Sequence, residues 1–215
     1  MNIGVLFEND EFWVAHKPAG LATIPERLNP EAPNLWKLGE NLVGSRLWVV
    51  HRLDKETSGV VVFAKNAEAH RRLNAFFEKR LVRKTYIAWV FGSWEGAGTC
   101  RAPLREFGSG RVAVDPARGK PSETAWKVLQ TRENCTLVEL NPATGRRHQL
   151  RVHLYHLGHP ILGDPLYGPA AQRGVWDRLY LHALELLLPL TPGPLTGWRA
   201  DPDPDFLLGP KKLYL

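Results

Sequence analysis

Short apolar runs of strand length, separated by turn residues, recur along most of this sequence. Near the N-terminus, Val5–Thr23 predicts two strands that are joined by a turn at Asn9 and Asp10. Only two segments, Ala67–Lys84 and Arg146–Gly158, are predicted as helices. Strand pairs that alternate with isolated helices are typical of the α+β class. We therefore expect an α+β fold with a mixed, largely antiparallel sheet.

The first predicted helix begins after Asn66, a residue type that often caps helix N-termini. Its apolar residues recur at helical spacing, at Leu73, Phe76, Phe77 and Leu81. The segment Ile24–Gly44 contains three prolines, and we expect a loop there with at most one helical turn. The Gly- and Pro-rich segment Ser93–Thr124 predicts an insertion that carries a hairpin. Further strands are predicted at Leu47–Val50, Val60–Ala64, Thr85–Gly92, Ala125–Gln130, Cys135–Leu140 and Tyr180–Leu190.

Composition limits the possible classes of protein. The 215 residues, 44% of them hydrophobic, suffice for one domain of one or two lobes with a sizeable core. The formal net charge of +6 favours an anionic partner such as nucleic acid. Cys100 and Cys135 lack metal-ligand or disulfide spacing, which indicates a reducing compartment. The N-terminus does not resemble a signal peptide, and no apolar tract is long enough for a membrane span. We expect a cytoplasmic protein without membrane contact.

One carboxylate, Asp54, stands out by its setting. It lies in a polar stretch that is enclosed by two apolar runs, Leu47–Val50 and Val60–Ala64, and it has the basic neighbours Arg52 and Lys55. Buried strands on both sides of a polar loop form a rigid support for a reactive side chain. A carboxylate held away from water needs an opposite charge or hydrogen bonds, and a nearby guanidinium lowers its pKa by about 1–3 units.

Four arginines are available to pair with Asp54, namely Arg52, Arg146, Arg147 and Arg151. Arg151 lies inside the second predicted helix, between the apolar Leu150 and Val152, so its charge also needs a partner. Pairing Arg151 with Asp54 would satisfy both groups. A purely structural ion pair would satisfy them equally well, and the residues alone leave both interpretations open.

The histidines His148, His153, His156 and His159 raise the possibility of a metal site. Their spacing does not match the metalloprotease pattern of two histidines that flank a glutamate, and no carboxylate lies within the predicted helix. We therefore expect no metal, and we expect these histidines to pack and to form hydrogen bonds. A metal-dependent hydrolase that uses this cluster stays an alternative.

Five segments then resemble one family in the same order along the chain. The nine residues "HRLDKETSG" (His51–Gly59) resemble the signature of the RluA-type family of RNA pseudouridine synthases. The other four are "KPAGL" (Lys17–Leu21), "RKTYIAWV" (Arg83–Val90), "TGRRHQLRVHLYHLGHPILGDPLYG" (Thr144–Gly168) and "LHALEL" (Leu181–Leu186). The resemblance implies an isomerase that converts a specific uridine to pseudouridine in ribosomal or transfer RNA, and a pseudouridine synthase fold of two lobes with a central catalytic cleft.

The resemblance also implies roles for individual residues. Asp54 corresponds to the catalytic aspartate, Tyr86 to the tyrosine that stacks on the flipped base, and Arg151 to the arginine that pairs with the aspartate. Arg52 corresponds to the arginine that enters the RNA stack where the uridine has left. Leu150 is expected to form an apolar wall of the pocket. His51 and Arg146, which lie within the matched segments, are expected to contact the substrate.

Several expectations concern the protein as a whole. Residues 1–215 are predicted to form a single catalytic domain without a separate RNA-binding domain, because "KPAGL" already belongs to the catalytic part. RNA contacts are then expected from the helix at 66–84 and the insertion at 105–120. We expect a monomer with no cofactor and no metal. A non-catalytic RNA-binding module on the same scaffold is the second alternative, which the presence of Asp54, Tyr86 and Arg151 disfavours.

Overall fold

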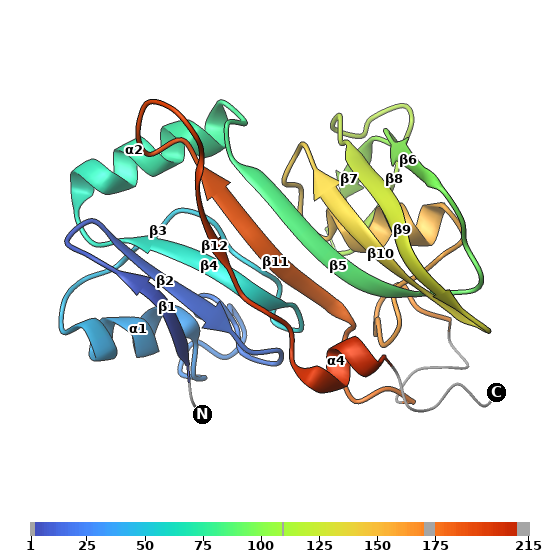
Figure 1. Ribbon diagram of the computed structural model, residues 1–215, viewed down its shortest axis with the longest axis horizontal. Coiled ribbons are helices and arrows are strands. Elements are labelled where there is room, and N and C mark those ends of the chain that lie inside the picture. The colour runs from blue at the N-terminus through green and yellow to red at the C-terminus, as the bar shows by residue number, and fades with distance from the viewer. Residues whose placement is uncertain (1–2, 109, 170–174, 210–215) are drawn as a thin grey trace. The chain divides into compact units, whose positions relative to one another are not determined.

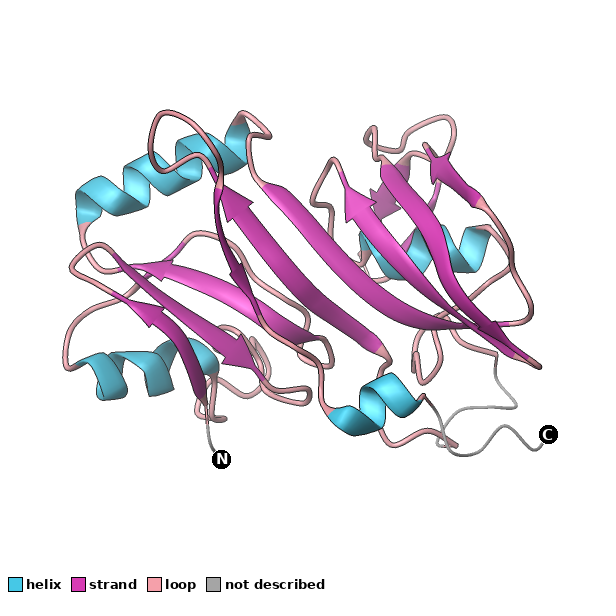
Figure 2. Cartoon of the chain, in the orientation of Figure 1, coloured by secondary structure: helices cyan, strands magenta, loops and turns pink. Residues whose placement is uncertain are grey.

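The chain divides into two compact units in the computed structural model, which describes residues 3–108, 110–169 and 175–209. The first unit comprises Met1–Lys84 and Ala183–Pro202, and the second comprises Thr85–His182 and Asp203–Leu215. Figure 1 labels their elements. Each unit combines strands with a few helices (Figure 2), which confirms the predicted α+β class.

The first unit is built on a sheet with the strand order β1-β2-β4-β11, in which β3 also pairs with β4 and β12 with β11. The pairs β1/β2, β2/β4, β3/β4 and β11/β12 are antiparallel. The strand bounds are β1 Gly4–Glu8, β2 Phe12–Lys17, β3 Trp48–Val49, β4 Ser58–Ala64, β11 Leu181–Leu188 and β12 Thr196–Arg199.

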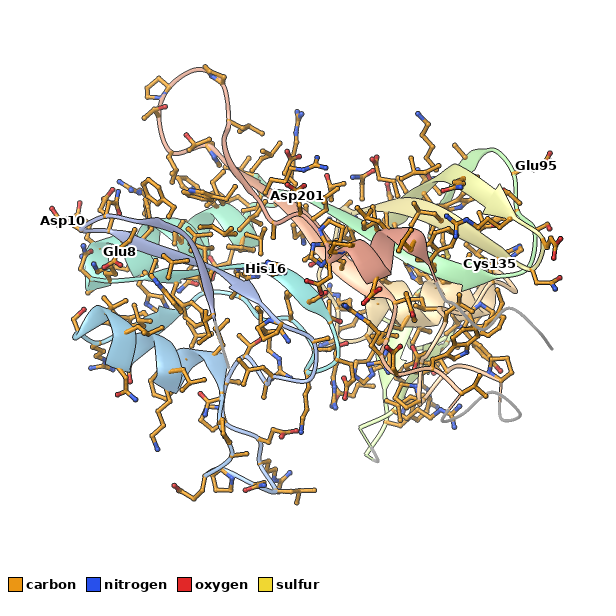
Figure 3. All side chains as sticks on the ribbon, turned by 60° about the horizontal axis from the view of Figure 1, so that its bottom comes forward. Glu8, Asp10, His16, Glu95, Cys135 and Asp201 are labelled. Atoms are coloured by element: carbon orange, nitrogen blue, oxygen red, sulfur yellow. The ribbon has the colours of Figure 1, made fainter. Side chains whose placement is uncertain are left out.

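The turn between β1 and β2 confirms the prediction made from Asn9 and Asp10. The Asn9 side-chain oxygen accepts hydrogen bonds from the backbone N–H groups of Glu11, at 2.9 Å, and Phe12, at 2.7 Å. An asparagine side chain that binds the backbone two and three residues further on is a local device for closing a turn. Figure 3 shows Glu8 and Asp10 together at this end of the hairpin.

Helix α2, Ala67–Glu78, begins as predicted at Asn66. The Asn66 side chain accepts a hydrogen bond of 2.8 Å from the Ala69 N–H. The helix is shorter than the predicted Ala67–Lys84, because Arg80 has a φ of 56° and Arg83 already begins the next strand. Leu81, which was expected on the buried helix face, is 47% exposed as a result.

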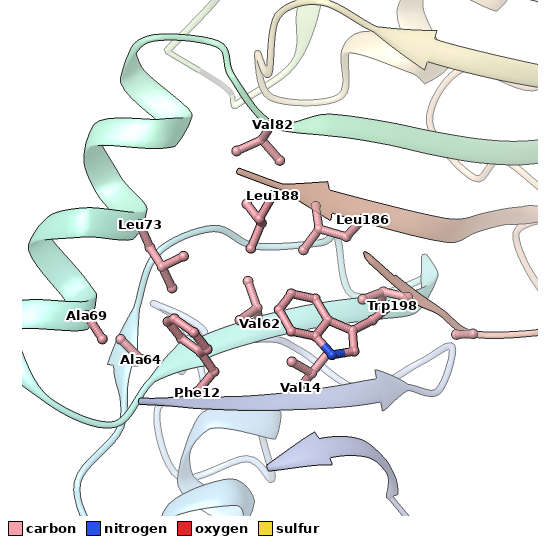
Figure 4. Packing of buried hydrophobic residues seen from close by; sticks show 12 residues of the cluster. Phe12, Val14, Val62, Ala64, Ala69, Leu73, Val82, Leu186, Leu188 and Trp198 are labelled. Atoms are coloured by element: carbon pink, nitrogen blue, oxygen red, sulfur yellow. The ribbon is translucent and has the colours of Figure 1, made fainter. Parts of the chain in front are cut away.

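The core of the first unit lies between α2 and one face of this sheet. Ala69 and Leu73 of α2 pack against β4, and Leu186 and Leu188 of β11 pack beside them (Figure 4). Trp198 of β12 closes the cluster, with its ring centre 6.4 Å from that of Phe12. Every residue of β4 is buried, as expected for the second apolar run beside Asp54.

The prediction of a loop with at most one helical turn at Ile24–Gly44 is confirmed for residues 24–34 but is wrong in the length of the helix, because α1 runs over Leu35–Val43. All three prolines precede Asn34, so none interrupts the helix. The Asn34 side chain accepts a hydrogen bond of 3.0 Å from the Lys37 N–H, and Gly44 ends the helix with a φ of 68°. The prolines upstream suggested a loop, although the helix that follows them is capped at both ends.

The second unit has a sheet with the strand order β5-β10-β9-β6, whose pairs β5/β10, β10/β9 and β9/β6 are antiparallel. The predicted insertion contains β6 and a separate hairpin of β7 and β8. The strand bounds are β5 Arg83–Phe91, β6 Ala97–Cys100, β7 Leu104–Glu106, β8 Val112–Val114, β9 Thr124–Arg132 and β10 Cys135–Pro142. These strands confirm the three predicted between Thr85 and Leu140.

Two helices complete the second unit. Helix α3, Gln149–His156, ends just before Gly158, which has a φ of 85°, and this confirms the predicted end of the helix. Val152 of α3 packs on the β7–β8 hairpin in one buried cluster with Val112. In helix α4, Pro204–Leu208, the Phe206 carbonyl accepts a hydrogen bond of 2.8 Å from the Trp89 indole N–H. No helix within the described ranges combines the length and apolar composition that a membrane span requires.

Replacing Gly39 of α1 with alanine is expected to destabilise the protein. An added Cβ would lie 2.4 Å from Cζ3 of Trp13, whose side chain is 0% exposed and has no room to move. Overpacking lowers stability by about 1–3 kcal/mol, which outweighs the advantage of about 1 kcal/mol that alanine has over glycine in a helix. Urea unfolding should therefore show a lower free energy of unfolding for Gly39→Ala.

Lys37→Ala, at an exposed position of the same helix, is the matched control and should change the free energy of unfolding by less than about 0.5 kcal/mol. A Gly39→Ala variant as stable as the parent would contradict the packing described here.

Candidate active site

Asp54 lies in the loop between β3 and β4 of the first unit, where the Thr57 N–H donates a hydrogen bond of 3.1 Å to the Asp54 carbonyl. The loop continues into the fully buried strand β4, which pairs with β2. Gly59, the last residue of the signature, has a φ of 120°, and a Cβ there would lie 2.1 Å from the Ala183 carbonyl oxygen. The glycine is therefore required, because the backbone of β11 passes directly against it.

A buried lysine holds this loop in place. Lys17 is 0% exposed, and its ammonium group donates hydrogen bonds to the carbonyls of Pro18 at 2.9 Å, Leu21 at 2.6 Å and Lys55 at 2.9 Å. The Gly20 N–H donates to the same Lys55 carbonyl at 2.9 Å. These bonds join the "KPAGL" segment to the residue that follows Asp54. The sequence analysis quoted this segment without assigning a role to its lysine.

The residue before Asp54 is held equally firmly. The Thr23 hydroxyl donates a hydrogen bond of 2.8 Å to the Leu53 carbonyl and accepts one of 3.2 Å from the Leu53 N–H. Thr23 and Leu53 are both buried. Because the backbone is fixed on both sides of Asp54, its carboxylate starts from a defined position. Thr23 gave no signal in the sequence, since its partner is 30 residues away.

His51 was predicted to contact the substrate. Its side chain contacts other residues of the first unit. Its Nε2 accepts a hydrogen bond of 3.1 Å from the Val62 N–H, and its ring stacks on Phe77 of α2 with 4.9 Å between ring centres. Burial, with a smaller contribution from the charge of Lys84, lowers the pKa of His51 to about 3. The imidazole is therefore neutral at physiological pH, with its proton on Nδ1.

Arg52 has the opposite character. Its side chain is exposed, and it forms no ion pair within the part of the chain that the structure describes. Its neighbour Lys55 forms a surface salt bridge of 2.7 Å with Glu26. An exposed guanidinium beside a fixed loop is able to reach an RNA substrate, in agreement with the predicted role of Arg52.

In the second unit, Tyr86 lies on β5, opposite Leu140 of β10, and it is partly buried. Arg151 lies on α3 and is 2% exposed. Its Nε and Nη2 donate to Oδ2 and Oδ1 of Asp164, both at 2.7 Å. Such a two-pronged pair is among the strongest arrangements of charged hydrogen bonds.

The sequence predicted that the charge of Arg151 needs a partner and offered Asp54 as one that would satisfy it. Asp164 already supplies an opposite charge to Arg151. The pairing of Arg151 with Asp54 therefore rests on the resemblance alone and stays a prediction. Asp164 belongs to the matched segment Thr144–Gly168, but no local pattern there indicates its pairing with Arg151.

Asp164 and Tyr167 extend the network around Arg151. Asp164 Oδ1 also accepts from the backbone N–H groups of Leu166 at 2.9 Å and Tyr167 at 3.0 Å. The Tyr167 ring centre lies 5.3 Å from the Arg151 Cζ. Its hydroxyl accepts from the Val112 N–H at 3.0 Å and lies 2.9 Å from Nδ1 of His148. Burial raises the pKa of Tyr167, so the hydroxyl keeps its proton and is able to donate it to His148.

The two remaining predicted substrate contacts differ in exposure. Leu150 of α3 is 7% exposed, so it is a buried residue of the helix. Arg146 is exposed at the surface, and its backbone is held by Gln149: its N–H donates a hydrogen bond of 3.0 Å to Oε1, and its carbonyl accepts one of 3.2 Å from the Gln149 N–H. The same oxygen accepts from the Thr144 hydroxyl at 2.7 Å, so the buried Gln149 orders the loop that carries Arg146.

Three of the four histidines considered for a metal site, His148, His153 and His159, have separate protein partners. His153 contacts the Thr124 hydroxyl at 2.9 Å through Nδ1 and the Ala102 carbonyl at 2.9 Å through Nε2. His159 contacts the Phe91 carbonyl at 2.8 Å. Among the residues that the structure describes, no three histidine, cysteine or acidic side chains are grouped to hold a metal ion.

Comparison with known proteins identifies the family. The family model described as RNA pseudouridylate synthase matches residues 11–156, a region that includes parts of both units. The chain therefore belongs to the RNA pseudouridylate synthase family and is an enzyme that isomerises uridine to pseudouridine in RNA.

Individual relatives agree with this assignment. The chain is 40% identical over 191 residues to the dual-specificity RNA pseudouridine synthase RluA of Vibrio vulnificus, with 85% of this chain and 76% of that protein covered. It is 38% identical over 197 residues to the ribosomal large subunit pseudouridine synthase C of Vibrio parahaemolyticus, with 85% of this chain and 60% of that protein covered. The structure of human RNA pseudouridylate synthase domain containing 1 matches with a TM-score of 0.79 and 30% identity, over 94% of this chain and 84% of that chain.

Removing the ammonium group of Lys17 is expected to destabilise the fold strongly. In Lys17→Met, three backbone carbonyls lose a charged donor, and each such loss is worth about 1–3 kcal/mol. We expect the free energy of unfolding, measured with urea, to fall by about 3 kcal/mol or more. Lys55→Met is the matched control from the neighbouring loop, because its surface salt bridge contributes at most about 1 kcal/mol. Equal effects of the two variants would refute the role given to Lys17.

The lowered pKa of His51 predicts a pH-dependent contribution to stability. The unfolded chain binds a proton near the ordinary pKa of 6.5, whereas the folded protein binds it only near 3. The contribution of neutral His51 is therefore complete above about pH 6.5 and is lost progressively as the pH falls toward 3. The destabilisation caused by His51→Gln, measured by urea unfolding, should accordingly shrink between about pH 7 and about pH 4. A difference that stays constant over this range would show that His51 is not held neutral.

Proposed function

We propose that Asp54 is the catalytic carboxylate of this RNA pseudouridine synthase, with Tyr86 stacking on the flipped uracil and Arg151 pairing with Asp54. The observation that supports the proposal is that hydrogen bonds hold both sequence neighbours of Asp54 in place. Lys17 and Gly20 hold Lys55, and Thr23 holds Leu53. A loop that is fixed this tightly from within the unit is suited to present the side chain of Asp54 to a substrate.

The reaction is an isomerisation in which all heavy atoms of the nucleoside are retained and one hydrogen is exchanged for another. The bond between N1 of uracil and C1′ of ribose breaks, the base rotates, and a bond forms between C5 and C1′. The hydrogen on C5 leaves as a proton, and N1 acquires a proton. No oxidant, reductant or external group donor is needed, and we propose that the enzyme works without a cofactor or a metal.

Asp54 has two chemically consistent roles. As a nucleophile, its carboxylate attacks C1′ and carries the ribose while the base rotates. As a base, it removes a proton from the sugar and generates a glycal-like intermediate. Both roles require an ionised carboxylate that is shielded from water, which a paired guanidinium at Arg151 would favour.

Access to a uridine within folded RNA requires base flipping, which costs a few kcal/mol. Stacking of an extruded base on an aromatic ring such as that of Tyr86 contributes about 1–3 kcal/mol. The exposed guanidinium of Arg52 is suited to fill the gap in the RNA stack, because it is planar and carries hydrogen-bond donors. Together these two side chains would offset the unfavourable energy of flipping.

Asp164 gains a function within this proposal. Its carboxylate occupies Nε and Nη2 of Arg151 and fixes the plane of the guanidinium. An oriented guanidinium of this kind would favour the proposed pairing of Arg151 with Asp54. We assign Leu150 to the apolar wall of the uracil pocket and Arg146 to phosphate contacts. His51 would act through the loop that it supports, since its described contacts are with Val62 and Phe77.

The substrate is proposed to be a uridine in ribosomal RNA, transfer RNA or both. The names of the relatives, a dual-specificity RNA pseudouridine synthase and a ribosomal large subunit pseudouridine synthase, support this class of substrate. The two units would act as a single catalytic domain, because the family match runs through both. A monomeric, cytoplasmic enzyme completes the proposal.

Replacing Asp54 with asparagine tests the proposal most directly. Asp54→Asn removes the charge but keeps the size, so we expect the rate of pseudouridine formation to fall by at least about 10²-fold. The measurement is the release of tritium from RNA that carries [5-³H]uridine. Glu56→Gln, at a second carboxylate of the same loop, is the control and should retain parental activity. If Asp54→Asn is folded, as judged by thermal unfolding, and as active as the parent, Asp54 is not the catalytic residue.

A further inference from the structure

A small pocket opens between β8 and helix α3 of the second unit, which are in contact. Its volume is about 130 Å³. The apolar floor is formed by Val112 and Val114 of the hairpin and by Val152 of the helix. Val112 and Val152 are 3% and 2% exposed, so this floor is part of the fixed core under the hairpin. Neither Arg151 nor Tyr86 lines the pocket, which is therefore separate from the residues assigned to the target uridine.

Two tyrosine rings border the pocket. Tyr167 is 3% exposed and fixed by its hydroxyl bonds, whereas Tyr155 of α3 is 53% exposed. Their ring centres lie 6.5 Å apart, and the rings are tilted by 47°. An exposed aromatic ring beside an apolar hollow leaves unfavourable apolar surface in water. A flat ring that enters the hollow would cover the Tyr155 face and the valine floor together.

Basic side chains stand at the rim of the same pocket. Arg111 and His156 are both exposed and line it, and the Arg111 Cζ lies 5.9 Å from the Tyr167 ring centre. The segment after β8 carries the further exposed cations Arg118 and Lys120, which do not line the pocket. An apolar floor, an aromatic wall and a cationic rim match a ligand whose flat ring is attached to an anion. A nucleotide of RNA has this chemistry, and the net charge of +6 agrees with it.

We propose that this pocket binds an unpaired base of the substrate RNA other than the target uridine, with Tyr155 stacking on the base and Arg111 facing its phosphate. The inference rests on the proposed function, because it takes RNA as the substrate. Tyr167 lies both at the wall of the pocket and against the Arg151 guanidinium. A base in the pocket would therefore be separated from Arg151 by a single side chain, which suits a nucleotide near the target in sequence or space.

The test begins with the full chain and its own substrate. The modified uridine is mapped by comparing pseudouridines in total RNA from cells with and without the gene, and a synthetic stem-loop that contains this site is prepared. A series of stem-loops then carries one abasic nucleotide at each position around the target. KM and the dissociation constant are measured for the parent, Tyr155→Ala, Tyr155→Phe and the control Leu129→Ala. Leu129 is 47% exposed on β9 and does not line the pocket.

If Tyr155 stacks on a base, Tyr155→Ala should raise the dissociation constant and KM by about 5- to 150-fold, the equivalent of one lost base stack. Tyr155→Phe, which keeps the ring, should retain most of the affinity, and Leu129→Ala should match the parent. At one position, the abasic stem-loop should bind the parent enzyme more weakly than the intact stem-loop does. The same stem-loop should show no further loss of affinity for Tyr155→Ala. That non-additivity would identify the base in the pocket.

Three results would overturn the inference: parental affinity in Tyr155→Ala, an equal loss in Tyr155→Phe and Tyr155→Ala, or abasic effects that add to Tyr155→Ala at every position. Each would mean that no base stacks on Tyr155, even if a protein or a small molecule uses the pocket. The proposed function fails on a different result, which is a parent enzyme that forms no pseudouridine in any of the RNA. The two failures are therefore distinguishable.

Discussion

The buried ammonium group of Lys17 is the interaction on which the first unit depends. A charge with no exposed surface is tolerable only if its donors are used, and three carbonyl groups use them here. Two of these carbonyls belong to the lysine's own turn, and the third belongs to Lys55, 38 residues further along the chain. Lys17 therefore converts a local turn into a support for a distant loop. The position of Asp54 follows from this support and from Thr23, which holds the opposite side.

The second unit also buries a charged group, the guanidinium of Arg151, and an ion pair stabilises it there. Arg151 is buried and pairs with the carboxylate of Asp164, which is itself held by two backbone N–H groups. Burying both charges carries a desolvation penalty, which the two-pronged pairing and the backbone hydrogen bonds to Asp164 offset. Tyr167 adds a ring against the guanidinium and connects it to the β7–β8 hairpin through Val112. Arg151 is consequently oriented by structure that is present before any RNA binds.

Much of this arrangement could be predicted from the sequence, because the relevant signals are local. The turn at Asn9 and the cap at Asn66 depend on side chains that bind backbone only a few residues away. The full length of helix α1 was missed because three prolines upstream obscured its caps. The roles of Thr23 and Asp164 could not be derived from the sequence. Each depends on a partner that lies near it only in the folded protein, and no local pattern indicates that partner. Candidate residues were thus found by motif, while the groups that hold them emerged only from the structure.

The glycine at position 59 has a consequence for how the protein is made. Ala183 passes so close to Gly59 that the two segments belong to one packed layer, although more than a hundred residues lie between them. During synthesis, residues 1–84 leave the ribosome long before their partner strand exists. The strand that follows Asp54 must therefore wait, with one edge uncovered, while residues 85–182 are translated. The loop that carries Asp54 is completed only near the end of translation, so a chain that ends before β11 would lack the packing that supports this loop.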